Sequence, residues 1–180
     1  APIELSAVIG SAATLMAFVL FVCTAMIYAG LRFLREWHTP LTVINYILLG
    51  GASGFTLAAA LAASALPDFA AFFAGWAVIL TLAGLVGRTA SLIRNARLKP
   101  KSTPQTAIGI KHPRIVQKTQ GAMGGSFNTR EFFHGQSQAV LRSVKWGFLL
   151  TAFLIPMILL SAGLSMGAGG VLSLAFVIQY

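Results

Sequence analysis

Apolar residues are concentrated in five long stretches of this chain, and charged residues fall in the connections between them. A membrane-spanning helix needs roughly 20 apolar residues, because each residue advances about 1.5 Å and the hydrocarbon layer is about 30 Å thick. We therefore predict an all-α fold, with residues 1–180 forming a single integral-membrane domain. It is a polytopic transmembrane helix bundle of about five spans. The predicted spans are 7–31, 41–66, 70–92, 146–162 and 167–180.

A long polar loop, residues 93–145, separates the third predicted span from the fourth. Apolar residues such as Ile108 and Phe127 are interspersed among its charges, and it contains turn-forming pairs such as Gly124-Gly125. A flexible linker would lack residues of the buried type, and loops of this length are usually either functional or disordered. We predict that this loop is ordered and functional.

Small residues recur at intervals of four along the second predicted span, at Gly50, Gly54, Ala58 and Ala62. Such a ridge allows a neighbouring helix to approach closely in a membrane. We predict that this ridge packs against another helix and has no ligand role.

Basic residues lie on one side of the predicted bundle. When five spans cross back and forth, both basic segments fall on the same face, whereas the opposite connections carry Glu4 and Asp68. Because cytoplasmic loops are enriched in Lys and Arg, this face and the 93–145 loop are predicted to be cytoplasmic. The thirteen basic residues are Arg32, Arg35, Arg88, Arg94, Arg97, Lys99, Lys101, Lys111, Arg114, Lys118, Arg130, Arg142 and Lys145.

The amino-acid composition agrees with a membrane protein and restricts the kinds of binding partner that we expect. The chain is 57% hydrophobic and only 9% charged, against about 25% charged for a soluble domain. The net charge of +9 does not require nucleic acid, because positively charged cytoplasmic loops produce the same excess. We expect membrane lipid as a partner, with anionic headgroups drawn to the basic face, and no nucleic acid.

Several kinds of site are missing from the sequence. Cys23 is the single cysteine, so neither a disulfide within the chain nor a thiolate-bound metal or iron–sulfur site can form. His38, His112 and His134 all lie in basic-side segments, so no pair can hold a transmembrane haem. No phosphate-binding loop, nucleophile motif or metal-ligand cluster is present. We predict a chain without catalytic residues, metal or haem.

Polar and aromatic residues cluster where the first span meets the second. A quinone site needs an apolar slot, hydrogen-bond donors for two carbonyls and a group that moves protons. Here His38 would exchange protons or contact a quinone carbonyl, Arg35 would stabilise negative charge on the quinone oxygen, and Trp37 would wall the slot. Alternatively, Trp37 is an interfacial belt residue and His38 is simply solvated. The predicted quinone-binding residues are Arg35, Trp37, His38, Asn45 and Tyr46.

A second cluster lies in the long loop. Two aromatic residues flanked by Arg, Glu and His match the composition of a protein–protein contact. The alternative is a re-entrant or surface helix folded against the chain's own spans. The predicted partner-binding residues are Asn128, Arg130, Glu131, Phe132, Phe133 and His134.

Three sequence segments resemble the membrane anchor subunit of DMSO reductase-type complexes. They are Trp37-His38-Thr39-Pro40-Leu41, the stretch 102–109, and the run 124–135 that contains Phe132-Phe133-His134. The last segment is the most specific and is similar to the membrane subunits of cytoplasmic sulfite dehydrogenases. The resemblance covers nearly the whole chain. It implies the last five of about eight family helices, so we expect the N-terminal part of the family to be missing.

The resemblance implies a haem-free, non-catalytic anchor in a bacterial inner membrane. Such an anchor would exchange electrons with an exchangeable quinone, while molybdopterin and iron–sulfur clusters belong to a catalytic subunit and an electron-transfer subunit. Because the face carrying Trp37 and His38 is the basic one, we prefer the sulfite dehydrogenase type over a quinol-oxidising DMSO reductase anchor. A purely structural anchor and a small membrane transporter remain alternatives, although few ionisable groups lie within the spans to support transport.

Overall fold

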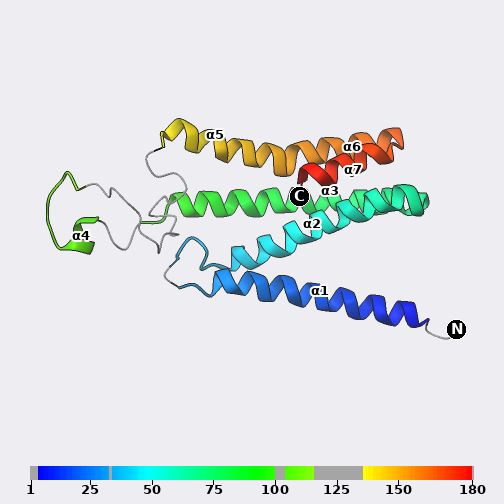
Figure 1. Ribbon diagram of the computed structural model, residues 1–180, viewed down its shortest axis with the longest axis horizontal. Helices are drawn as coiled ribbons and strands as arrows, with labels where there is room; N and C mark the ends of the chain where they lie inside the picture. The colour runs from blue at the N-terminus through cyan, green and yellow to red at the C-terminus, as the bar shows by residue number, and fades with distance from the viewer. Residues whose placement is uncertain (1–3, 33, 100–103, 116–135, 180) are drawn as a thin grey trace.

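The computed structural model describes residues 4–32, 34–99, 104–115 and 136–179, and these residues form helices without any strand. Four helical segments are long and apolar enough to cross a membrane. Figure 1 shows these segments running side by side along the long axis of the molecule. The prediction of an all-α, polytopic helix bundle is confirmed. The four segments are Leu5–Ala29, Pro40–Ala65, Pro67–Ala96 and Gln138–Met166.

The first three helices follow one another through short connections. Helix α2 starts at Thr39-Pro40, where the Thr39 hydroxyl accepts from the backbone N–H of Leu41 (3.4 Å) and proline occupies the first turn, which needs no backbone donor. Leu66 alone separates α2 from α3. The bounds are α1 Leu5–Ala29, α2 Pro40–Ala65, α3 Pro67–Ala96 and the short α4 Pro104–Ile108.

The fourth crossing is one continuous helical segment with a π-helical turn in its middle. It begins at Gln138, where the Ser137 hydroxyl accepts from the backbone N–H of Val140 (3.3 Å), so it starts before the predicted span at 146. The π turn immediately precedes Pro156, where the helix lacks a backbone donor. The elements are α5 Gln138–Leu149, η3 Leu150–Leu154, α6 Ile155–Met166 and the shorter α7 Gly169–Gln179.

The interface between α2 and α3 is built from small residues. Every buried position of α3 is Ala, Gly, Ser or Thr, spaced three or four residues apart, which keeps one face toward its neighbour. On α2 the predicted ridge packs only in part. Gly50 faces Phe21 of α1, where an added Cβ would lie 2.6 Å from the ring, and Ala62 is buried, as predicted. Gly54 is exposed and has no described residue near it, so the prediction was wrong for this residue. The buried α3 positions are Ala74, Ala77, Thr81, Gly84, Gly87 and Ser91.

A polar contact joins three helices inside the bundle. The Gln179 side chain on α7 accepts a hydrogen bond from Thr56 of α2 (2.6 Å) and donates one to Thr81 of α3 (2.9 Å). Both threonines are fully buried. Because lipid offers no hydrogen bonds, such pairs hold helices together within a membrane. The contact therefore attaches α7 to the α2–α3 pair.

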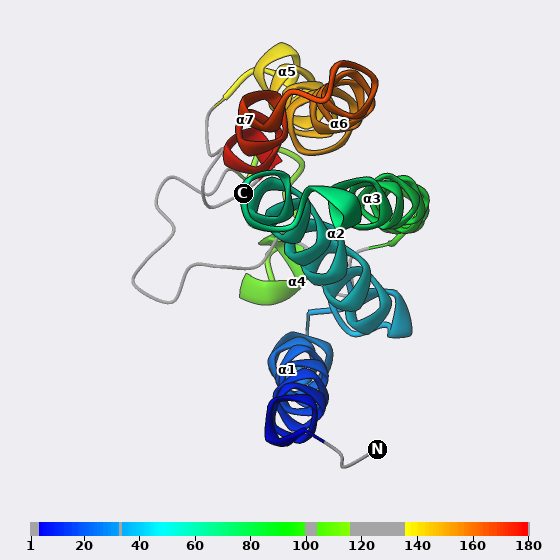
Figure 2. The same cartoon turned by 90° about the vertical axis from the view of Figure 1, so that its right-hand side faces the viewer.

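One end of the bundle gathers the described basic residues; we call it the basic end. Here α1 and α3 finish and α2 and α5 begin, on the side toward α4 in Figure 1. The Arg94 side chain at the end of α3 donates to the backbone carbonyl of Arg35 (3.0 Å), so two segments far apart in sequence emerge together. Seen end-on in Figure 2, α1 lies at the edge of the bundle, away from α5, α6 and α7.

Candidate functional site

The junction between α1 and α2, residues 30–39 without residue 33, carries three of the predicted quinone-site residues, Arg35, Trp37 and His38, at the basic end. Its backbone is wound in tight turns, with the N–H groups of Trp37 and His38 both donating to the carbonyl of Leu34. The Thr42 hydroxyl donates to the carbonyl of Trp37 (2.6 Å). Backbone polar groups near a membrane need such partners, and these bonds hold Trp37 and His38 in place.

His38 lies at a pocket of about 610 Å³ between the end of α1 and the start of α2. Its Nδ1 is 2.6 Å from the carbonyl oxygen of Ala29. Because a carbonyl can only accept, Nδ1 carries the proton, and in the neutral imidazole Nε2 is then an acceptor. Nε2 of His38 is therefore an acceptor for a hydrogen bond from a ligand in the pocket. The pocket is lined by Met26, Ala29, His38, Thr39, Pro40, Val43 and Ile44.

Three aromatic residues outside the pocket lining form a cluster where α1 meets α2. Tyr28, near the end of α1, meets Trp37 edge-on (centroids 5.1 Å apart, 77°) and lies nearly parallel to Tyr46 of α2 (5.6 Å, 23°). Aromatic pairs in these geometries stabilise beyond their buried area. Trp37 and Tyr46, both predicted, are thus joined through Tyr28, which the sequence prediction did not include. The enrichment of Tyr and Trp at membrane interfaces is the signal that would have identified Tyr28.

Arg35 lies outside the lining of the pocket. Its Nη1 donates to the backbone carbonyl of Lys99 (3.2 Å), and its own carbonyl accepts from Arg94. These two contacts tie the junction to the chain just beyond α3. In the described structure Arg35 therefore supports the position of the junction.

Asn45 faces the interior of the bundle. Its Nδ2 donates to the Ser91 hydroxyl on α3 (2.8 Å), and a Cβ on Gly87 would lie only 2.5 Å from its Oδ1. That oxygen is buried and accepts no hydrogen bond from the described residues. Of the five predicted residues, His38 alone lines the pocket, Trp37 and Tyr46 both contact Tyr28, and Asn45 lies in the α2–α3 contact.

Glu36 is a second residue that the sequence prediction did not include. It is only 6% exposed, and its Oε2 has no hydrogen-bond partner among the described residues. A buried, incompletely paired carboxylate is costly to maintain. An acidic residue beside two arginines is typical of a solvated surface, so no pattern in the sequence indicated its burial.

The remaining predicted features fall partly outside the described residues. The partner-binding residues Asn128, Arg130, Glu131, Phe132, Phe133 and His134 all lie between 116 and 135, which the structure does not describe. Among the described residues no group of His, Cys, Asp or Glu is arranged to hold a metal ion. The pocket beside His38 is therefore the candidate functional site.

The bundle and this pocket together define a multi-pass membrane protein with a site of small-molecule size at its basic end. Residues 2–110 match the family described as DMSO reductase anchor subunit (DmsC). The chain belongs to this family, as its resemblance predicted.

A sulfite dehydrogenase subunit from Allochromatium vinosum is 53% identical to the chain over 178 residues, which are 99% of this chain. The aligned part is 55% of that relative, so the chain spans about half of its length. This similarity confirms the expected relation to the sulfite dehydrogenase branch. No solved structure matches the chain.

Proposed function

We propose that this chain is the quinone-interacting membrane anchor of a molybdopterin and iron–sulfur oxidoreductase complex. In this role it passes electrons between an iron–sulfur subunit and the quinone pool. The observation that carries the proposal is the pocket beside His38, at the basic end where a soluble partner would dock. Membership of the anchor family supports the same role.

The pocket suits the chemistry of a quinone. Its volume of about 610 Å³ lies within the range of roughly 300–1,000 Å³ usual for small-molecule sites. Met26, Val43 and Ile44 offer an apolar surface for the ring, while His38 offers one polar group for a ring oxygen. The quinone supplies the redox chemistry when bound. The chain positions the ring, limits access of water and exchanges a proton at Nε2 of His38.

The partners would carry the other cofactors. We place the iron–sulfur subunit at the basic end, held by Asn128, Arg130, Glu131, Phe132, Phe133 and His134, with the molybdopterin subunit beyond it. No haem or metal belongs to this chain in the proposal. A sulfite dehydrogenase complex is the preferred type because of the relative from Allochromatium vinosum.

Purification tests the proposal directly. We expect an affinity-tagged chain, extracted gently from membranes, to bring molybdenum and iron with it, and the complex to reduce a quinone analogue with sulfite as electron donor. Reduction of DMSO with quinol, but no oxidation of sulfite, would identify the DMSO reductase type. Solute flux in vesicles containing this chain alone, without bound molybdenum or iron, would contradict the anchor role.

The orientation of the basic end is a separate expectation. A protease site inserted after Lys111, which is exposed beyond α3, should be cut from the cytoplasmic side of the inner membrane and protected from the periplasmic side. A matched site between α6 and α7, at Gly167, should show the opposite accessibility. Cutting of the Lys111 site from the periplasm would instead place the catalytic partners there.

A further inference from the structure

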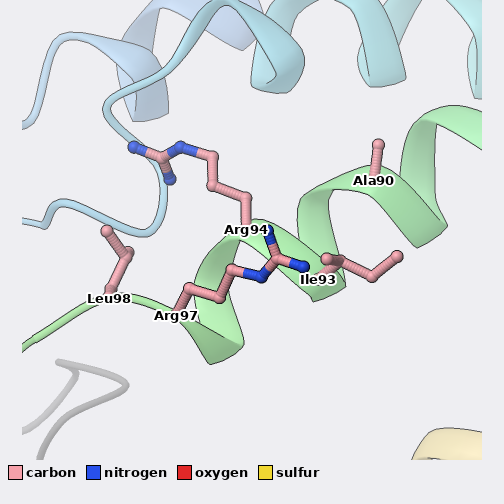
Figure 3. Close-up of a pocket in the computed structure, with 5 residues that line it drawn as sticks. All are labelled: Ala90, Ile93, Arg94, Arg97 and Leu98. Atoms are coloured by element: carbon pink, nitrogen blue, oxygen red, sulfur yellow. The ribbon is translucent and has the colours of Figure 1, made fainter.

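A second pocket, of about 530 Å³, lies at the end of α3 and is separate from the His38 site. Two arginines and three apolar residues line it (Figure 3). In Figure 3 the Arg94 side chain extends toward the α1–α2 junction, whereas Arg97 lies back along α3 toward Ile93. The lining residues are Ala90, Ile93, Arg94, Arg97 and Leu98.

The distribution of charged residues along α3 indicates where this pocket lies relative to the membrane. No charged residue occurs between Asp68 and Arg88, and roughly 20 residues of helix advance about 30 Å, the thickness of the hydrocarbon layer. Arg94 lies nearly two turns beyond Arg88, about 9 Å along the axis. The headgroup layer extends about 5–8 Å beyond the hydrocarbon on each side, and long basic side chains reach back to it. The backbone of Arg97 lies about 13 Å beyond Arg88, but its side chain lies back along α3 toward Ile93 (Figure 3) and so points to the level of the lipid phosphates.

The two arginines of this pocket form no ion pair with an acidic residue in the described part of the chain. Arg94 uses Nη1 for its hydrogen bonds, which go to the carbonyl of Arg35 and to Asn95 Oδ1 (3.0 Å each). Arg97 is exposed and makes no side-chain hydrogen bond or ion pair with the described part of the chain. Guanidinium groups favour phosphate, because their planar N–H groups can bind two oxygens at once.

An apolar track leads from the pocket into the membrane. Leu82, Val86, Ala90, Ile93 and Arg97 are three or four residues apart and so share one face of α3. Leu82 is 51% exposed, Val86 65% and Ile93 51%. A ligand with a phosphate and a long hydrocarbon tail would match this combination of cationic pocket and apolar stripe.

We infer that the end of α3 is a binding site for an anionic phospholipid, whose phosphate contacts Arg97 beside the positive charge of Arg94 and whose acyl chain lies along Ile93, Val86 and Leu82. The site is independent of the quinone pocket. Loss of the Arg97 side chain should weaken binding without disturbing the fold, because this side chain makes no hydrogen bond to the described residues. Arg94 is a poorer choice for a test because it also holds the junction.

Native mass spectrometry of the full-length protein in detergent tests the inference, with phosphatidylglycerol and phosphatidylcholine added in turn. We expect wild type to retain phosphatidylglycerol in preference to phosphatidylcholine. Arg97→Gln should weaken retention about fivefold, the change expected for one basic side chain at a membrane surface, and Arg97→Lys should weaken it less. Arg142→Gln is the matched control, since Arg142 is exposed at the same end and lies outside this pocket.

Four results would overturn the inference. The first is equal retention of the two lipids by wild type, and the second is an equal loss in the Arg97→Gln and Arg142→Gln variants. The third is displacement of the lipid by inorganic phosphate at millimolar concentration, which would indicate a site for a free anion without a role for the tail. The fourth is unchanged lipid retention by Arg97→Gln together with weaker binding of soluble subunits, which would assign Arg97 to a protein contact.

Discussion

Replacing His38 with alanine should slow quinone reduction by the assembled complex about a hundredfold, the lower end of the usual contribution of a positioned acid or base. His38 is the only titratable side chain that lines its pocket in the described part of the chain. Its Nδ1 is fixed by the Ala29 carbonyl, which leaves Nε2 for proton exchange. The measurement is the steady-state rate with a soluble quinone analogue, on complex whose molybdenum and iron contents equal those of wild type.

His38→Asn separates the proton-exchange role from a structural one. The asparagine amide can still donate to the Ala29 carbonyl, so the junction should keep its shape, but the side chain cannot exchange a proton near neutral pH. We expect this variant to be as slow as His38→Ala.

The control is His112→Ala. His112 is exposed at the same end of the bundle, and its ring accepts a hydrogen bond from the backbone N–H of Arg114 (3.1 Å). It lies outside the pocket, so its loss should leave the rate unchanged. Full activity of His38→Ala in an assembled complex would mean that quinone reacts elsewhere, and the site assignment would be wrong.

The first three helices lie close to their predicted spans, because a length of apolar residues sufficient to cross a membrane is visible without any tertiary information. The last predicted span, 167–180, corresponds to the shorter α7, which is not among the four described segments long enough to cross a membrane. The start of α5 at Gln138 was not predicted from the sequence, which placed the beginning of this span at residue 146. Arg142 and Lys145 fall in its first turns and made this segment resemble a loop, although Ser137 caps the helix and the apolar residues alternate with the basic ones. Amphipathic helices at an interface carry less apolar signal than spanning ones.

The choice of packing face was harder to predict. The interval of four residues on α2 identified Gly50, which faces Phe21 of α1, but also Gly54, which is exposed. The small residues of α3 from Ala74 to Ser91 recur every three or four positions, and this series was also visible in the sequence. Which of several small-residue stripes faces a partner depends on the other helices, and a single sequence does not contain that information.

In the candidate site, too, some residues could be assigned from the sequence, whereas other contacts required the tertiary structure. His38, Trp37 and Tyr46 could be assigned to one region because they lie close in sequence at a span boundary. Asn45 adjoins Tyr46 in sequence, yet consecutive helical residues point in different directions, and its side chain bonds to Ser91 on α3. Tyr28 approaches Trp37 and Tyr46 only because α1 packs beside α2, and this contact required the tertiary structure.

Phe153→Ala should produce the largest loss of stability among single core substitutions. Phe153 is fully buried in the π-helical turn. It meets Phe148 edge-on (5.9 Å) and fills the space that Gly84 leaves open on α3, where an added Cβ would lie 3.5 Å from its ring. Removing the ring leaves a cavity at the contact between the fourth crossing and α3.

The expected loss is about 2–3 kcal/mol, below the roughly 3–5 kcal/mol typical of Phe→Ala in soluble cores. The difference arises because separated helices in a membrane remain in lipid, which is as apolar as the protein interior, so the transfer term largely disappears and the cavity term remains. Unfolding in mixed micelles by a denaturing detergent would measure it. Phe153→Leu should cost less, because the smaller side chain still fills part of the space.

Phe69→Ala is the matched control, since Phe69 in the first turn of α3 is exposed and its removal opens no cavity. A loss for Phe69→Ala as large as that for Phe153→Ala would show that both measurements report general helix destabilisation. A neutral Phe153→Ala would mean that α3 and the fourth crossing close over the space, since cores that collapse onto a deleted side chain lose little stability.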